Sequence, residues 1–498
     1  MKASKPSAKS KLQPSGPRVS GAAPKSPVGR AAAGTVNVWE DDPGTGVITS
    51  TPIPDVAKQP LAYRFPDPAP APSDDSTSPA FLYWTAAAAL RRGADFWAPK
   101  VPTGQWQLGP VLPVLLDEGV DLNAYYDRQA LNFFHGPSPN GTAYSGASPD
   151  VVCHEMGHAI LDSLKPQLWD AANQESSAFH ESFGDMSAIL SALQQQSLRT
   201  AVLADTAGHL YRSSRLSRLA EELGAAIRAQ QPDAVDPDCL RNAVNSFTYA
   251  DPSTLPSSAP ASQLSSEVHS FSRVFTGAFF ECLAGMLANH AADSAKPTAN
   301  ELLDVSLQMR DILVAGVRNA AVVSNFFAEV AAAMVQASSS TNPAYPAIFN
   351  GAFVRRAILS LQTAANIRQL QASAAASASV AGLADTLAAA PLDRVALPTA
   401  HYGLSEPLLV QTPSHPRRVA TMAGSGPARQ AEPLSAVSAA SHFVDSLFAN
   451  GHVDYNKFGI EGMALTGGRK VKTHRIVRGK DGALSLSRLL FDCGFCRC

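Results

Sequence analysis

The chain has 498 residues, of which 45% are hydrophobic and 16% charged, so it has enough apolar material for a large core. Its formal net charge of −2 gives no global reason to expect nucleic acid or a membrane surface as a partner. No run of about 18 apolar residues is present, and the basic N-terminal stretch lacks the apolar centre of a secretory signal peptide. We therefore expect a cytoplasmic or non-classically exported protein.

The first 78 residues have the composition of a tail and a linker. Residues 1–34 are rich in Lys, Ser, Pro and Ala, which is typical of disorder. Strand-forming residues surround a Pro-Gly turn, so short strands are expected near 35–53. The proline-rich stretch at 66–79 predicts a stiff linker or loop.

Residues 79–365 have the patterns of one mixed α+β domain. Large apolar groups at helical spacing fill 80–97, and extended segments are expected within 109–126. A helix, a loop and a second helix are expected between 150 and 196. Helical periodicity then returns at 268–290, 299–318, 324–337 and 345–362.

The remaining chain is expected to be a linker and a small C-terminal segment. Residues 366–435 are first Ala-rich and then rich in Pro, Ser and Ala. Residues 436–498 contain a β-hairpin pattern around Asp481-Gly482 and end in "CGFCRC". Cys493, Cys496 and Cys498 could bind a metal, but no second Cys pair lies nearby, so a flexible and redox-labile end is favoured.

The stretch "DVVCHEMGHAILD", residues 150–162, carries the first chemical signal. Residues four apart lie on one face of a helix, so His154 and His158 can point at one metal ion. Glu155 is offset from that face and stands where a general base for a metal-activated water belongs. The alternative is a helix that carries two histidines by chance.

A third ligand is expected from "SSAFHESFGDMSAIL", residues 176–190. Glu181 and Asp185 share one helix face, which suggests Glu181 as the ligand and Asp185 as the acceptor for a ligand histidine's N–H group. His180 is the rival third ligand, although as the neighbour of Glu181 it points to a different face. Zn²⁺ with three protein ligands and one open position is the catalytic pattern.

This arrangement resembles the thermolysin-like zinc peptidases, the gluzincin group. Their pattern is His-Glu-x-x-His followed by Glu-x-x-x-Asp on a second helix, here "HEMGH" at 154–158 and "ESFGD" at 181–185. The resemblance covers roughly residues 80–362. It implies a fold with a β-rich N-terminal lobe, a helical C-terminal lobe and the zinc site in the cleft between them.

Three further segments are similar to that family. "NAYYDRQALNFFHG", residues 123–136, resembles its edge strand, which implies that Asn123 and the Ala124 carbonyl pair with a substrate backbone. "LRNAVN" implies that Arg241 holds a substrate carbonyl. "EVHSFSRVFTGAFF" implies that His269 is the second catalytic histidine, which stabilises the oxyanion.

The chain departs from the family at several positions. Trp169 stands where the family has a tyrosine that donates to the oxyanion, and Leu264 stands where an acid orients the catalytic histidine, with Glu267 as a nearby substitute. Asp150 matches one calcium ligand, but Ala192 replaces another carboxylate, so a double calcium site is doubtful and calcium binding stays open.

The resemblance implies a zinc-dependent endopeptidase that acts on peptides or proteins, with no nucleic-acid or membrane partner. One alternative is a catalytically impaired relative that binds peptide or protein partners, which Trp169 and Leu264 favour and the intact Glu155 opposes. Another is a protein whose function lies in its tails. No recognisable motif indicates the substrate preference, the oligomeric state or the activation route.

Overall fold

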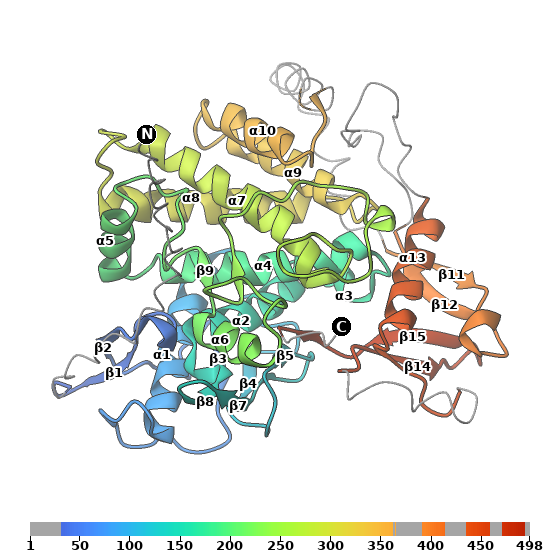
Figure 1. Ribbon diagram of the computed structural model, residues 1–498, viewed down its shortest axis with the longest axis horizontal. Coiled ribbons are helices and arrows are strands. Elements are labelled where there is room, and N and C mark those ends of the chain that lie inside the picture. The colour runs from blue at the N-terminus through green and yellow to red at the C-terminus, as the bar shows by residue number, and fades with distance from the viewer. Residues whose placement is uncertain (1–30, 362–363, 365–390, 414–434, 459–470, 494–498) are drawn as a thin grey trace, which may run out of the picture.

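The structure is a computed structural model that describes residues 31–361, 364, 391–413, 435–458 and 471–493. It has a mixed α+β fold (Figure 1). Within residues 31–361, most of the strands come before most of the helices along the chain. The strands before residue 145 are β1 (Thr35–Trp39), β2 (Ile48–Pro52), β3 (Ala62–Arg64), β4 (Val111–Leu115), β5 (Ala124–Tyr126), β6 (Leu131–Phe133), β7 (His135–Ser138) and β8 (Gly141–Tyr144).

These strands form a central sheet and two hairpins. The sheet has the order β16-β5-β6-β4-β3, in which β16 (Phe491–Asp492) comes from the far end of the chain. Strands β3, β4 and β6 run parallel, whereas β5 is antiparallel to both β6 and β16. The pairs β1-β2 and β7-β8 are antiparallel hairpins.

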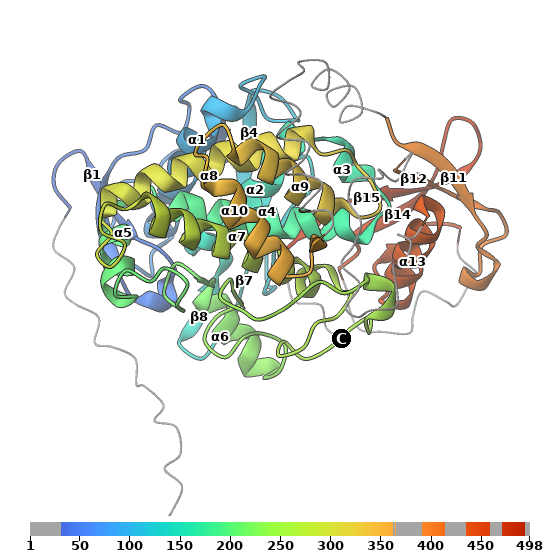
Figure 2. The same cartoon turned by 90° about the horizontal axis from the view of Figure 1, so that it is seen from above.

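Most of the helices pack beside this sheet as a second layer, whereas the helices at 79–97 and 221–230 lie among the strands (Figures 1 and 2). Short strands β9 (Arg218–Leu219) and β10 (Arg241–Asn242) pair within the connections between them. The helices are α1 (Pro79–Trp97), α2 (Pro149–Leu164), α3 (Gln167–Asp170), α4 (Gln174–Ala192), α5 (Gln196–Asp205), α6 (Glu221–Gln230), α7 (Val268–His290), α8 (Ala299–Asn319), α9 (Phe326–Ser338) and α10 (Tyr345–Arg355). The helices predicted from periodicity in this region are confirmed, except that the one predicted at 345–362 ends at Arg355.

Local sequence sets where the two central helices start. The Ser148 side chain accepts a hydrogen bond from the Val151 N–H group and Pro149 occupies the first turn of α2. Asn173 caps α4 in the same way, through the N–H group of Glu175. Both helices are buried along almost their whole length.

Helices α2 and α4 approach each other closely because two glycines face across their interface. A Cβ atom on Gly157 would lie 2.8 Å from the Ser187 Cβ atom and 2.9 Å from the Gly184 Cα atom. A Cβ atom on Gly184 would lie 2.6 Å from the His154 ring. No larger residue fits without moving one helix.

The C-terminal residues build a second hydrophobic core at one end of the molecule (Figures 1 and 2). A sheet of order β11-β12-β15-β14-β13 packs against α13 (Ala436–Ala449) through Leu408, Phe443, Val444 and Ile476. Its strands are β11 (Asp393–Leu397), β12 (Leu408–Thr412), β13 (Val453–Asp454), β14 (His474–Arg478) and β15 (Leu484–Arg488). The predicted hairpin around Gly482 is confirmed as β14-β15.

Two predicted linkers are wrong in part. Strands β1 and β2 confirm the short strands expected near 35–53, but the predicted linker also contains β3, where Leu61 and Tyr63 are buried in the main core and the Tyr63 hydroxyl group donates to the Ala87 carbonyl of α1. Residues 391–413, predicted as linker from their Pro, Ser and Ala content, form β11 and β12, because Leu397, Leu408 and Val410 complete the second core. The tail at 1–30 and most of the Ala-rich segment lie outside the described residues.

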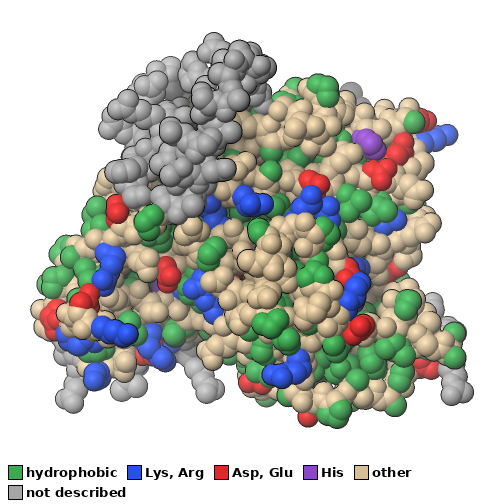
Figure 3. All heavy atoms as spheres, turned by 180° about the vertical axis from the view of Figure 1, so that it is seen from behind, with side chains coloured by type: hydrophobic (Ala, Val, Ile, Leu, Met, Phe, Trp, Pro, Cys, Tyr) green, Lys and Arg blue, Asp and Glu red, His purple; other side chains and the backbone are tan. Residues whose placement is uncertain are grey.

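Helix α7 is the one described helix that is long and apolar enough to cross a membrane, but 78% of its most apolar window is buried inside the protein. It packs as a core helix against α4, α8 and α10. The molecular face in Figure 3 has Lys and Arg side chains interspersed with Asp and Glu side chains, as the small net charge leads one to expect.

We predict that Gly157→Ala lowers the free energy of unfolding by about 1–3 kcal/mol, because the new methyl group must displace α4. Urea unfolding of metal-free protein measures the change. Gly351→Ala is the matched control, since its Cβ atom would meet only the end of the Arg355 side chain, at 3.2 Å. That control is expected to be about 0.5–1 kcal/mol more stable than wild type. Equal effects of the two substitutions would contradict the proposed tight helix contact.

Candidate metal centre

Helix α2 brings the two predicted histidine ligands together. The rings of His154 and His158 lie edge to face with their centroids 4.9 Å apart, and both are buried. The Nε2 atoms of both rings have no hydrogen-bond partner among the described residues. Two adjacent buried nitrogens without partners are unusual unless something else binds them.

Helix α4 supplies Glu181 as the third group. Its Oε2 atom lies 3.3 Å from the His154 Nε2 atom, and its Oε1 atom lies 3.7 Å from the His158 Nε2 atom. Bonds of about 2.0–2.1 Å at tetrahedral angles would place zinc ligand atoms about 3.3 Å apart. The three residues therefore fit one zinc ion, and their ligand atoms all lie within 4.8 Å of one another.

The rival ligand His180 is buried beside this group but faces elsewhere. Its ring stacks on Phe491 at a centroid distance of 3.9 Å and lies 5.6 Å from the His158 ring. Burial and the nearby Arg488 hold the pKa of His180 well below its usual value. The geometry therefore favours Glu181 over His180 as the third ligand.

Asp185 and Arg241 hold the orientation of His154. The His154 Nδ1–H group donates to Asp185 Oδ1 over 3.0 Å, which leaves Nε2 free to bind a metal. Arg241 Nη2 donates to the same carboxylate oxygen over 2.9 Å. Burial alone would raise the pKa of Asp185, but Arg241 and His154 outweigh it and lower the pKa to about 2. Asp185 is therefore an anion in the core, paired on two sides.

Glu155 lies at the edge of the metal site with both carboxylate oxygens unpartnered among the described residues. It is fully buried, and burial raises its pKa to about 8. Burial thus favours the protonated form of Glu155, and a metal cation beside it would favour the carboxylate form that a general base requires.

His269 enters the site from the first turn of α7. Its Nδ1 atom lies 2.6 Å from the Glu267 Oε1 atom, and its Nε2 atom lies 3.3 Å from the Glu181 Oε2 atom. Burial opposes the charged ring, but Glu267 and Glu181 outweigh it and raise the pKa of His269 well above its usual value. Glu267 is thus the acid that contacts His269, whereas the Leu264 side chain packs against the main core.

The predicted substrate strand is already paired with the chain's own end. Ala124 lies in β5, and its carbonyl accepts a hydrogen bond from the Cys493 N–H group over 2.8 Å. Asn123 is buried and its side-chain oxygen accepts from the N–H group of Ala124. Trp169 packs edge-on against Tyr126 and Phe491, and Arg128 lies over its ring.

Asp150 belongs to a buried acidic cluster that includes residues far away in sequence. Asp41, Asp42 and Glu221 join it, and burial raises the pKa of Asp41 and of Glu221 to about 8. Asp42 accepts hydrogen bonds from Ser148 and from the N–H group of Glu222, and Asp150 accepts one from the Ala220 N–H group. Calcium binding here stays an open prediction.

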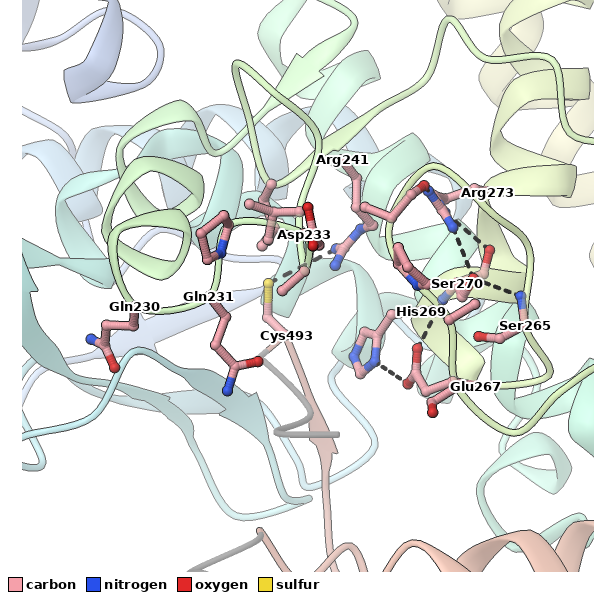
Figure 4. Close-up of a pocket in the computed structure, with 18 residues that line it drawn as sticks. Gln230, Gln231, Asp233, Arg241, Ser265, Glu267, His269, Ser270, Arg273 and Cys493 are labelled. Atoms are coloured by element: carbon pink, nitrogen blue, oxygen red, sulfur yellow. Dashed lines mark hydrogen bonds and ion pairs between the residues drawn. The ribbon is translucent and has the colours of Figure 1, made fainter.

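A cavity of about 540 Å³ opens beside Arg241 and His269 (Figure 4). The side chains of Arg241, His269, Glu267 and Cys493 line it, together with the segment at 230–235. The sequence did not predict that Cys493 lies at this site. No periodic pattern in "LLFDC" marks it, so the Cys-x-x-Cys motif was the sole available signal.

No protein-family model matches the chain, and no curated protein matches it either.

We predict that Glu181→Ala weakens zinc binding by more than about 100-fold. Residues that only support a ligand typically change metal affinity by at most about 100-fold, so a larger loss indicates a ligand. The substitution His180→Ala is not expected to cause such a loss. Elemental analysis after dialysis and a competitive chelator titration measure occupancy and affinity. Loss of zinc in the His180 variant with retention in the Glu181 variant would reverse the assignment.

Proposed function

We propose that the protein is a zinc-dependent endopeptidase of the thermolysin-like type. The observation that carries this proposal is the buried group of His154, His158 and Glu181, whose unpartnered ligand atoms have the separations of a tetrahedral site. The unpartnered carboxylate of Glu155 beside the group supports catalysis rather than a purely structural ion, because it matches the position of a general base.

Zinc held by these residues would supply a Lewis acid for a water molecule and a peptide carbonyl. Glu155 would take the proton of the water and pass it to the leaving amine. His269, oriented by Glu267, would donate its Nε2–H group to the carbonyl oxygen as negative charge develops there. Asp185 would keep His154 in the tautomer that presents Nε2.

Substrate would lie along β5 as an added strand. The Ala124 carbonyl points to the position of a partner N–H group, as its hydrogen bond with Cys493 demonstrates. Arg241 lies against the same cleft and lines its cavity (Figure 4). In this proposal the strands before residue 145 form one lobe, the helices after it form the other, and the cleft runs along α2.

The second candidate is a catalytically impaired relative that binds a peptide or protein partner. One specific observation favours it, namely that β5 and His269 are both engaged by the end of the chain. The intact set of Glu155, Glu267 and His269 favours the enzyme, because a binding protein does not need a buried and unpartnered general base.

We predict that Glu155→Gln retains zinc and fold but abolishes peptide hydrolysis, because the amide cannot take the proton. Mass spectrometry of a mixed peptide pool, with zinc content measured in parallel, tests this. The exposed Glu118→Gln is the control and should behave as wild type. Hydrolysis by the Glu155 variant at the wild-type rate would place the general base elsewhere.

We predict that His269→Ala lowers the turnover number by at least about 10²-fold at unchanged zinc occupancy, since it removes a donor to the developing oxyanion. Trp169→Tyr is expected to raise turnover or leave it unchanged, depending on whether a hydroxyl group there reaches the oxyanion. Steady-state kinetics on one peptide measure both variants. Wild-type turnover in the His269 variant would make this histidine structural.

A further inference from the structure

The described end of the chain enters the cleft as a strand. Phe491 pairs with Tyr126 and Asp492 pairs with Tyr125, in antiparallel register, so β16 completes the central sheet at β5 (Figure 1). An added strand on an exposed sheet edge is a common way in which proteins bind extended peptides. The edge that a substrate needs is therefore covered by the protein itself.

The hydrogen bonds of this strand reproduce those expected of a substrate. The Cys493 N–H group donates to the Ala124 carbonyl over 2.8 Å. The His269 Nε2–H group donates to the carbonyl oxygen of Asp492. His269 thus contacts a peptide carbonyl, which is the group that it would polarise in catalysis.

The side chain of Cys493 lies beside His154, Glu155 and Arg241. Its Sγ atom, a ring nitrogen of His154 and a carboxylate oxygen of Glu155 all lie within 4.8 Å of one another. Arg241 Nη2 lies 3.9 Å from the sulfur (Figure 4). A water molecule activated by Glu155 would lie between that carboxylate and the proposed metal ion, and the Cys493 thiol lies on this Glu155 side of His154.

Two residues anchor the strand in this position. Phe491 stacks on the rings of His158 and His180 at interplanar angles of 17° and 19°. Arg488 lies over the Phe491 ring and donates hydrogen bonds to the Trp169 carbonyl and the Ser177 hydroxyl group, each over 2.8 Å. Both anchoring side chains are at least nine-tenths buried, so the contact belongs to the folded protein.

We infer that residues 491–493 act as an internal inhibitor, which fills the peptide-binding groove and offers the Cys493 thiolate to the open coordination position of the metal. This inference rests on the proposed function. Thiolate is a preferred zinc ligand, at about 2.3 Å from the ion. Cys493 would release its proton to solvent as the sulfur–metal bond forms and would displace the water that Glu155 needs. Peptide hydrolysis then requires that the strand leaves the groove.

Cobalt substitution of the full chain tests the sulfur ligand. A thiolate bound to Co²⁺ gives a charge-transfer absorption in the near ultraviolet, which we expect in wild type and not in Cys493→Ser. The double variant Cys496→Ser/Cys498→Ser is the matched control and should keep the band. Bound cobalt without the band in wild type would overturn the inference and leave the metal centre intact. Absence of cobalt binding in every variant would overturn the proposed function as well.

Binding of a fluorescent peptide hydroxamate to zinc-loaded protein tests groove occupancy. The double variant Phe491→Ala/Cys493→Ser is expected to bind it at least about tenfold more tightly than wild type, because the probe no longer competes with the strand. The control without Cys496 and Cys498 should match wild type. Equal affinities in a folded double variant would overturn the inference, as would an intact-mass measurement that shows cleavage between Asp492 and Cys493.

Discussion

The close contact between α2 and α4 is the constraint on which the rest of the site depends. Gly157 and Gly184 remove the side chains that would hold the helices apart, and this brings Glu181 to within 3.3 Å of the His154 ring nitrogen. A third ligand from another helix needs that separation to be correct to a few tenths of an ångström. This contact between the helices adds Glu181 to the pair of His154 and His158, and the three residues together could hold a metal ion.

Charge balance gives a second reason for a cation at this position. Arg241 is paired with Asp185, and His269 is paired with Glu267. Glu181 contacts the rings of His154, His158 and His269, whereas Glu155 takes part in no described ion pair. Burial disfavours the charged form of Glu155, and a divalent ion beside it would stabilise that form.

The parts of the site that follow from local geometry could be predicted from the sequence. The pair His154 and His158 needs only the period of a helix, and the helices at 268–290 and 299–319 follow from apolar spacing. Strand β16 could not be predicted, because two residues have no periodicity and their partner β5 lies far away in sequence. The Pro, Ser and Ala content around β11 and β12 gives no strand signal. These strands are stabilised by packing in the second core and not by their own strand propensity.

The pairing of β16 with β5 also affects the order of events during synthesis. The main core is complete, apart from Phe491 and Cys493, when the ribosome has passed residue 361. Domains fold as units while the chain emerges, and the remaining residues need on the order of ten seconds to be made. The groove that strand β16 covers would therefore be open to the proposed metal ion until β16 has been made.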